Sequence, residues 1–312
     1  MVNENKTILN KKIMNNMKLW VLAGTLFCGL TLLTACGDDN DDPMTPPTPQ
    51  EEQSQPKLKI SKVYSANTVK AERKIAGQWT TLYEQTQERA QVYDFQWNDD
   101  RLARIVKNDA TWVFTYDDQQ RVVFAQIANT RFSYAYTYDA QGRLAQSVNT
   151  VPSTSTLDHV YTTTYIYSGG KLVKTVETGD FNGDTELPAT AVANETTTYE
   201  WQGDNIASTT IEMEHLNGER TSETLVFEYI DQLNPFRDDM LLQTHVYYLL
   251  GYETGDACLS KNLLKSTTVG PSVSTYEYTI EGGRVVSIAS NNTAESAAMR
   301  LNTHTEEDLE YY

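Results

Sequence analysis

Aromatic residues recur at alternate positions along the chain, and this period of two predicts β-strands. An i, i+2 spacing places both rings on one face of an extended segment, whereas a helix would scatter them around its circumference. Ser133, Ala135 and Thr137 alternate with a run of tyrosines, as expected for a strand with one polar face. The pairs are Phe95/Trp97, Phe114/Tyr116, Tyr136/Tyr138, Tyr165/Tyr167, Tyr199/Trp201, Phe227/Tyr229 and Tyr276/Tyr278.

Turn residues follow most of these pairs. FTYDDQQRV begins at Phe114 and YTYDAQGRL begins at Tyr136, so nearly the same text occurs twice. Asp139 suits the first position of a turn, where its carboxylate can accept hydrogen bonds from the backbone ahead, and Gly142 suits the left-handed position. A basic or polar residue and an aliphatic residue come next: Arg101-Leu102, Arg121-Val122, Arg143-Leu144, Lys171-Leu172, Asn205-Ile206 and Arg284-Val285. Each unit therefore predicts one β-hairpin, repeated about seven times.

A single hairpin cannot bury its aromatic face, so successive hairpins are expected to pair edge to edge. The predicted fold is all-β: a long antiparallel meander of hairpin repeats, curled into a barrel-like or spiral sheet because a long twisted sheet cannot stay flat. We assign one antiparallel β domain to residues 58–312, with the repeat core at 90–290. Wider spacing predicts longer loops after Asn149 and Thr178, and residues 293–312 give no clear pattern.

The N-terminal segment has the three parts of a lipoprotein signal peptide, which we assign to residues 1–35. Lys18 provides a basic start, Leu19–Leu33 is an apolar run too short to span a membrane as a helix, and Leu33-Thr34-Ala35-Cys36 follows. This ending resembles the bacterial lipobox, in which the cysteine is lipidated and becomes the first residue. Cys36 is therefore the predicted lipidation site and the predicted attachment to the membrane.

An acidic and proline-rich stretch, residues 36–57, predicts a tether. Four aspartates directly follow Cys36 in GDDNDDP, and Pro43–Pro56 contains no aromatic residue with which to build a core. The acidic run resembles the export tag of Bacteroidetes lipoproteins, which implies an outer-membrane lipoprotein facing the cell exterior. A solvated linker is the alternative interpretation.

The charge balance narrows the classes of partner. The formal net charge is −17, so the chain has no basic surface that would release counterions from a nucleic acid. The same charge disfavours electrostatic binding to anionic lipid. We expect no nucleic-acid partner, and the acidic surface fits a soluble domain.

The repeat unit resembles the YD repeats of Rhs-type proteins. Together with the leader and with Asn234-Pro235-Phe236, it resembles a Bacteroidetes lipoprotein family of unknown function described as having a porin-like fold. That resemblance covers roughly residues 92–288 and implies a curled antiparallel sheet without implying an activity. A membrane-spanning barrel is not expected, because the aromatic residues lie in the middle of the strands and the opposite face is rich in Thr, Ser and charge.

Candidate chemistry is sparse. Asp180, Asn182 and Asp184 alternate as calcium ligands do, although the glycine and final ligand of an EF-hand are misplaced, so this is a weak calcium candidate. The four histidines, His159 among them, lack zinc spacing and are expected at the surface or in loops. Only Cys258 remains a free thiol, and no nucleophile motif, P-loop or dinucleotide motif occurs. We name no catalytic residue and expect no cofactor.

The expected function is a non-catalytic binding or structural role at the cell envelope. The first alternative is a carbohydrate-binding accessory of a glycan-uptake system, with Trp79 and Trp112 as candidate ligand contacts, whereas Trp97 and Trp201 are expected in the core. A hydrolase, which needs carboxylates converging in a cleft, is the second alternative. A lipid-carrying half-barrel would need an unfilled apolar interior. A glycan or an envelope protein is the expected partner.

Overall fold

The computed structural model describes residues 59–107, 110–153, 157–184, 187–237 and 258–312. All of them belong to one compact unit, residues 58–312. Cys36, the predicted signal peptide and the predicted tether lie outside the described residues. No helix among the described residues is long and apolar enough to cross a membrane.

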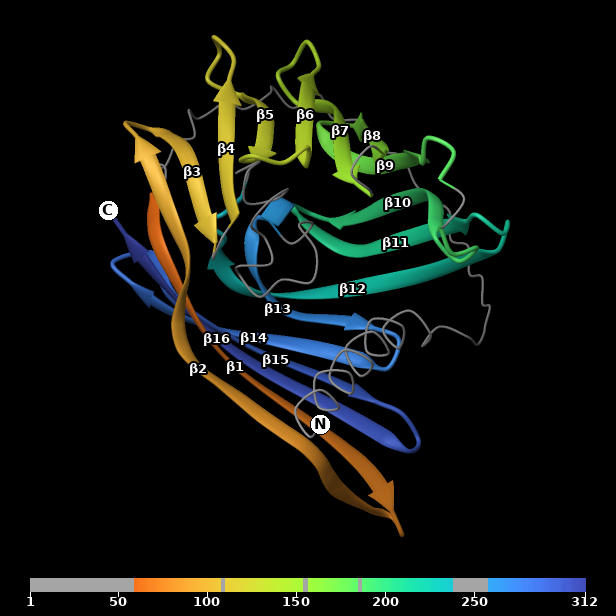
Figure 1. The fold of residues 1–312 in the computed structure, drawn as a ribbon. Helices are drawn as coiled ribbons and strands as arrows, with labels where there is room; N and C mark the ends of the chain where they lie inside the picture. Colours follow the sequence, from red (N-terminus) through yellow and green to blue (C-terminus); the bar gives the residue numbers. More distant parts are fainter. Residues whose placement is uncertain (1–58, 108–109, 154–156, 185–186, 238–257) are drawn as a thin grey trace, which may run out of the picture. The chain divides into compact units, whose positions relative to one another are not determined.

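The described chain forms an antiparallel barrel in which strands adjacent in sequence are adjacent in space, and β1 pairs with β16 to close it. The predicted all-β hairpin meander is confirmed, and it closes as a barrel (Figure 1). The strands are β1 (Ile60–Ile75), β2 (Gln78–Asn98), β3 (Arg101–Lys107), β4 (Ala110–Tyr116), β5 (Val122–Ile127), β6 (Ser133–Tyr138), β7 (Leu144–Pro152), β8 (Asp158–Ser168), β9 (Lys171–Asp180), β10 (Val192–Gln202), β11 (Asn205–His215), β12 (Arg220–Leu233), β13 (Asn262–Val269), β14 (Ser272–Glu281), β15 (Arg284–Glu295) and β16 (Met299–Tyr311).

The YD turns are held by an aspartate–arginine clamp. One carboxylate oxygen of Asp139 accepts hydrogen bonds from the backbone N–H groups of Gln141 (3.0 Å) and Arg143 (2.9 Å), and the other accepts from Arg143 Nε (2.8 Å). Asp117 holds Arg121 in the same way. Bonds from the Arg121 backbone and side chain lower the pKa of the Asp117 carboxyl. The predicted role of Asp139 is thus confirmed, and Gly142 has the left-handed φ of 79°.

A second interaction ties each hairpin to its neighbour, and we call it the rim bond. The polar tip of a Tyr or Trp near the turn donates a hydrogen bond to the backbone carbonyl of an aliphatic residue in the preceding strand. Eight strand pairs, from β1/β2 to β15/β16, carry one rim bond each. These run from Trp97 to Ile60 (2.7 Å), Tyr116 to Leu102 (2.9 Å), Tyr138 to Val122 (2.6 Å), Tyr167 to Leu144 (3.0 Å), Trp201 to Leu172 (2.8 Å), Tyr229 to Ile206 (2.8 Å), Tyr278 to Leu264 (2.8 Å) and Tyr311 to Val285 (2.7 Å).

The basic residue of each motif packs on the ring that makes the rim bond. Arg121 lies 4.4 Å from the ring centre of Tyr138, and Arg143 lies 4.3 Å from that of Tyr167. Burial of the ring raises the pKa of Tyr138 to about 12, so its hydroxyl remains a donor at neutral pH. In the basic–aliphatic dipeptide of the repeat, the basic side chain therefore covers the ring of the next hairpin, and the carbonyl oxygen of the aliphatic residue accepts a hydrogen bond from that ring's polar tip.

The first ring of each pair fills the barrel at this end. Phe95, Phe114, Tyr136, Tyr199 and Phe227 are all buried in one apolar cluster. Outward positions between them are exposed and mostly polar, as with Thr115, Thr137, Thr198, Ser222, Thr224 and Glu228. The interior is therefore packed with aromatic residues where the hairpins turn, and the outward positions are mostly polar, with scattered exposed aliphatic residues such as Val113, Ile166 and Val226.

Two details extend the sequence prediction. The segment 293–312, which showed no clear pattern, contributes the long strand β16, whose Leu309 is buried and whose Tyr311 makes the last rim bond. The longer loops predicted after Asn149 and Thr178 begin slightly later in the structure, because β7 continues to Pro152 and β9 to Asp180. Trp97 and Trp201 pack against the core as expected.

Replacing Tyr138 by Phe is expected to lower the free energy of unfolding by about 1–2 kcal/mol, because the ring stays while the Val122 carbonyl loses its donor. Urea denaturation measures this loss. Tyr64→Phe is the matched control: its ring also lies under an arginine, Arg89 at 4.2 Å, and no rim bond is removed. Equal losses in both variants would show that the rim bond does not stabilise the barrel.

Candidate functional site

Half-buried aromatic residues line the inner face of β4–β9 beyond the packed end. They share the inner face with the buried rings because they lie an even number of residues away along the strands, as Trp112 does from Phe114 and Tyr134 from Tyr136. Tyr134 pairs with Asn149, Asn149 pairs with Tyr161, and Tyr161 pairs with Gly179, so one level of the wall crosses four strands. We call this group the inner-wall row: Trp112, Phe132, Tyr134, Asn149, Tyr161 and Phe181.

The rings of the row contact one another. The Trp112 ring centre lies 5.5 Å from that of Phe132, edge to face, and 6.0 Å from that of Tyr134. Tyr134 in turn stacks on buried Tyr136, with 3° between the ring planes. Such pairs hold aromatic side chains in fixed orientations, and their remaining surface offers flat apolar faces.

Asn149 is the polar member of the row. Its amide oxygen Oδ1 is buried and accepts no hydrogen bond from the residues that the structure describes. A buried amide oxygen without a donor costs free energy, and such atoms in native proteins call for an explanation. Its place between Tyr134 and Tyr161 puts a free acceptor between two rings.

Gly179 makes room for the last ring of the row. A Cβ at this position would lie 2.7 Å from Phe181 Cζ, closer than van der Waals contact allows. The bare backbone lets Phe181 fold back over β8, where its ring meets Tyr161 edge to face at 5.8 Å. Burial, with help from Glu177, raises the pKa of the Tyr161 hydroxyl, so the row stays uncharged at neutral pH.

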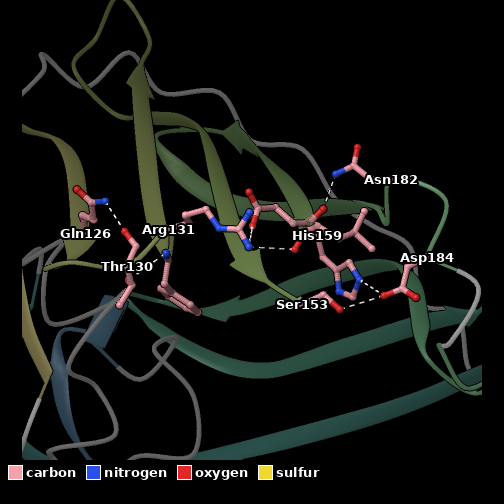
Figure 2. A network of polar contacts seen from close by, with 10 residues as sticks. Gln126, Thr130, Arg131, Ser153, His159, Asn182 and Asp184 are labelled. Atoms are coloured by element: carbon pink, nitrogen blue, oxygen red, sulfur yellow. Dashed lines mark hydrogen bonds and ion pairs between the residues drawn. The ribbon is translucent and has the colours of Figure 1, made fainter. Parts of the chain in front are cut away.

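A polar network closes the same end of the wall (Figure 2). His159 Nε2 lies 2.9 Å from Asp184 Oδ2, and the Ser153 hydroxyl donates to the same oxygen at 3.0 Å. Arg131 pairs with the Asp158 carboxylate at 3.2 Å. The network joins the β5–β6 turn, the end of β7, β8 and the β9–β10 connection, so it fixes the segments that carry Phe132 and Phe181.

His159 differs from its expected surface position. It is buried, with 7% of its surface exposed, and its ring packs edge to face on Phe181 at 5.3 Å. The pleat explains this, because His159 lies two residues before Tyr161 and six before Tyr165 and so shares their inward face. This spacing is visible in the sequence, whereas the absence of zinc-binding spacing does not predict burial.

Ser153, His159 and Asp184 are the residue types of a catalytic triad, but their arrangement differs from one. In a triad the imidazole lies between hydroxyl and carboxylate and takes the hydroxyl proton. Here the hydroxyl and the imidazole both bond to Asp184 Oδ2. The hydroxyl is therefore not activated by the histidine, and the network holds loops together.

The calcium candidates also have partners within the protein. Asp180 accepts a hydrogen bond from the Asn182 backbone at 2.9 Å, Asn182 Nδ2 donates to the Asp158 carbonyl, and Asp184 belongs to the His159 network. No group of three His, Cys, Asp or Glu side chains that could hold a metal occurs among the described residues. Calcium binding here stays a prediction.

The two candidate tryptophans lie in different surroundings. Trp112 belongs to the inner-wall row, whereas Trp79 lies beside the turn between β1 and β2. The Trp79 ring is covered by two cations, Arg300 at 4.4 Å and Lys74 at 5.2 Å. Trp112 therefore lies among other rings and Trp79 against two cations, and ligand contact at either residue stays a prediction. Cys36 lies outside the described residues.

A buried glutamate stands elsewhere on the inner face. Glu307 on β16 has 6% of its surface exposed, and its Oε2 has no hydrogen-bond partner among the described residues. Burial raises the pKa of Glu307 to about 8, partly opposed by the positive charge of Lys107. Desolvation in turn lowers the pKa of Lys107. The carboxyl is thus mostly protonated at neutral pH.

This burial makes stability depend on pH. In the unfolded chain Glu307 loses its proton near pH 4.3, but the folded protein keeps it until about pH 8. Between these values the native state binds the extra proton, so the free energy of unfolding falls as pH rises. Glu307→Gln should remove this part of the slope and stabilise the protein at pH 8 relative to pH 5, by a difference on the order of 3 kcal/mol. Urea unfolding at several pH values measures it.

Glu310→Gln is the control, since Glu310 is exposed on the same strand and its loss should leave the slope as it is. If Glu307→Gln kept the wild-type slope, the buried carboxyl would not be its source.

Comparison with known proteins gives only distant likenesses. No family model and no curated protein matches the chain. Solved structures that resemble it include a porin-like protein from Bacteroides uniformis ATCC 8492 (14% identity, 82% of this chain and 98% of that chain, TM-score 0.44) and a porin-like protein from Bacteroides vulgatus ATCC 8482 (13%, 82% and 99%, TM-score 0.47). A third is the Photorhabdus luminescens Tc holotoxin pore (11%, 70% and 12%, TM-score 0.31). All three TM-scores lie below 0.5, so no function follows from these likenesses.

Proposed function

We propose that the chain is a lipid-anchored, non-catalytic binding barrel of the outer membrane, exposed at the cell surface. The outer face of the barrel carries this proposal. On β10, exposed Thr198 and Glu200 alternate with buried Thr197 and Tyr199, and on β12 exposed Thr224 alternates with buried Leu225. A membrane-spanning barrel needs a continuous apolar band on that face. A barrel with this surface needs a separate anchor.

The anchor that we propose is lipid on Cys36. The lipobox and its basic and apolar flanks support it, and two or more acyl chains hold a protein at a membrane stably, since each buried methylene contributes about 0.8 kcal/mol. Lys59, where the described chain begins, lies at the turn end of the barrel, because its carbonyl accepts a hydrogen bond from the Tyr312 backbone at 3.1 Å. The acidic run after Cys36 supports export to the outer face. Membership of the Bacteroidetes lipoprotein family with YD repeats belongs to this same proposal.

Cys36→Ser should abolish lipid attachment. The unaltered chain, expressed in a Bacteroidetes host, should incorporate labelled palmitate, pellet with outer membranes and be cleaved by protease added to intact cells. The serine variant should lose all three properties because it offers no thiol to acylate. Cys28→Ala, within the apolar run, should keep them. Palmitate on the Cys36→Ser variant would rule out the proposed anchor.

A second candidate function is carbohydrate binding by the inner-wall row. The observation that favours it is the group of half-buried rings, Trp112, Tyr134 and Tyr161, which lie on one inner face. Aromatic faces stack on the apolar faces of sugar rings. Trp112 extends the row at one end, so it is the ring most suited to a ligand contact.

Trp112→Ala should weaken binding of any glycan recognised on an array by about tenfold, because it removes one stacking face. Isothermal titration with the strongest array ligand measures the change, with circular dichroism to show an intact barrel. Trp79→Ala should leave affinity unchanged, since cations already cover that ring. If only Trp79→Ala weakened glycan binding, the binding site would lie outside the inner-wall row. If no glycan on the array bound the protein, this candidate function would be wrong.

A further inference from the structure

One long stretch of β2 has a neighbour on one side only. Asp94–Asn98 of β2 pair with β3, but the residues before them pair only with β1 within the described chain. Because β2 spans 21 residues and β3 only 7, β2 runs far past the end of its second neighbour (Figure 1). We call Gln78–Gln91 the free edge. Along it, every second residue directs its backbone N–H and C=O away from β1.

The free edge is open to solvent on both faces. Every residue in it is exposed except the half-buried Trp79, and its apolar side chains Leu82 and Tyr83 are 55% and 46% exposed. Natural proteins cover, shorten or disrupt such edges, because an unpaired strand is a template for another strand. Here the register with β1 shifts at three places, and the edge carries charged residues. These features discourage pairing of identical copies while leaving the edge accessible.

The charges on the free edge select between partners. Arg89 is already neutralised, since its Nε lies 2.7 Å from Asp308 Oδ2 and its guanidinium covers the Tyr64 ring. Glu84 and Glu88 form no ion pair with the residues that the structure describes, because Lys70, which lies opposite Glu84 on β1, pairs with Glu72 at 3.1 Å instead. The uncompensated charge of the edge is therefore negative. A second copy of this chain, with a net charge of −17, would be repelled, whereas a basic segment would be attracted.

We propose that the free edge docks an extended segment of a partner polypeptide that carries lysine or arginine, by strand addition. In this mode the backbone hydrogen bonds supply most of the affinity, and the side chains at alternate positions choose the partner. The free backbone groups of Gln78–Gln91 would receive the main chain of the segment. Glu84 and Glu88 would pair with its basic side chains and fix its position along the edge.

Hydrogen–deuterium exchange with mass spectrometry tests this on the purified full chain in detergent micelles. The probe is a synthetic peptide of about ten residues that alternates lysine with threonine and valine, a length typical of one strand. Two controls replace its lysines by glutamates or its central residue by proline. The basic peptide should slow exchange in Gln78–Gln91, and neither control should, because glutamate is repelled and proline interrupts the backbone pairing.

A variant tests the role of charge. Glu84→Gln with Glu88→Gln should weaken binding of the basic peptide about fivefold and reduce its dependence on salt, as expected for two exposed ion pairs. Glu277→Gln with Glu281→Gln makes the same change in net charge on β14, where both residues are exposed, and should leave affinity unchanged.

Three results would overturn the proposal. The first is the absence of protection in Gln78–Gln91 at peptide concentrations of about 1 mM, the weak end of specific binding. The second is equal protection by the basic and acidic peptides, which would show that charge does not select the partner. The third is protection that rises with protein concentration alone, which would make a second copy the occupant.

Discussion

The rim bond is the interaction on which the barrel depends. A hairpin of this repeat has one aromatic face and cannot stand alone, so something must fix the order and register in which hairpins meet. Tyr138 does this by reaching into the preceding hairpin and donating to the Val122 carbonyl, while Arg121 covers its ring. A hydrogen bond of this kind, with Tyr or Trp as the donor, occurs at every second strand interface of the described barrel.

Fixing the register fixes both faces of the wall. When the rim residues are aligned, alternation along each strand sends the first ring of each pair inward and the residue between the two rings, such as Thr115 or Thr137, outward, because the side-chain period of a strand is two. The aromatic packing at the turn end and the inner-wall row beyond it are successive levels of this one alternation. The barrel thus acquires a filled end, a polar exterior and a half-buried aromatic wall from a single repeated motif. The free edge of β2 arises where the repeat is absent and strand lengths no longer match.

The sequence predicted the hairpins well because their information is local. Asp139, Gly142 and the paired rings lie within a few residues of one another, and their turn chemistry is specific. Closure was less predictable, since it depends on β1 meeting β16 over nearly the whole domain, and Tyr311 has Leu309, not an aromatic ring, two residues before it. The inner-wall row was missed for a similar reason: its members become neighbours only through strand register, as Asn149 does between Tyr134 and Tyr161.

Truncation of the last two residues tests the central claim most directly, because Tyr311 makes one of the two rim bonds that flank the closure between β16 and β1. Urea unfolding of the shortened chain should be followed by tryptophan fluorescence, which reports on Trp97, Trp112 and Trp201, and by circular dichroism. If the ring of rim bonds holds the barrel together, both signals should shift to a lower urea midpoint together. An unchanged midpoint, with only β16 losing its protection from hydrogen exchange, would contradict the account.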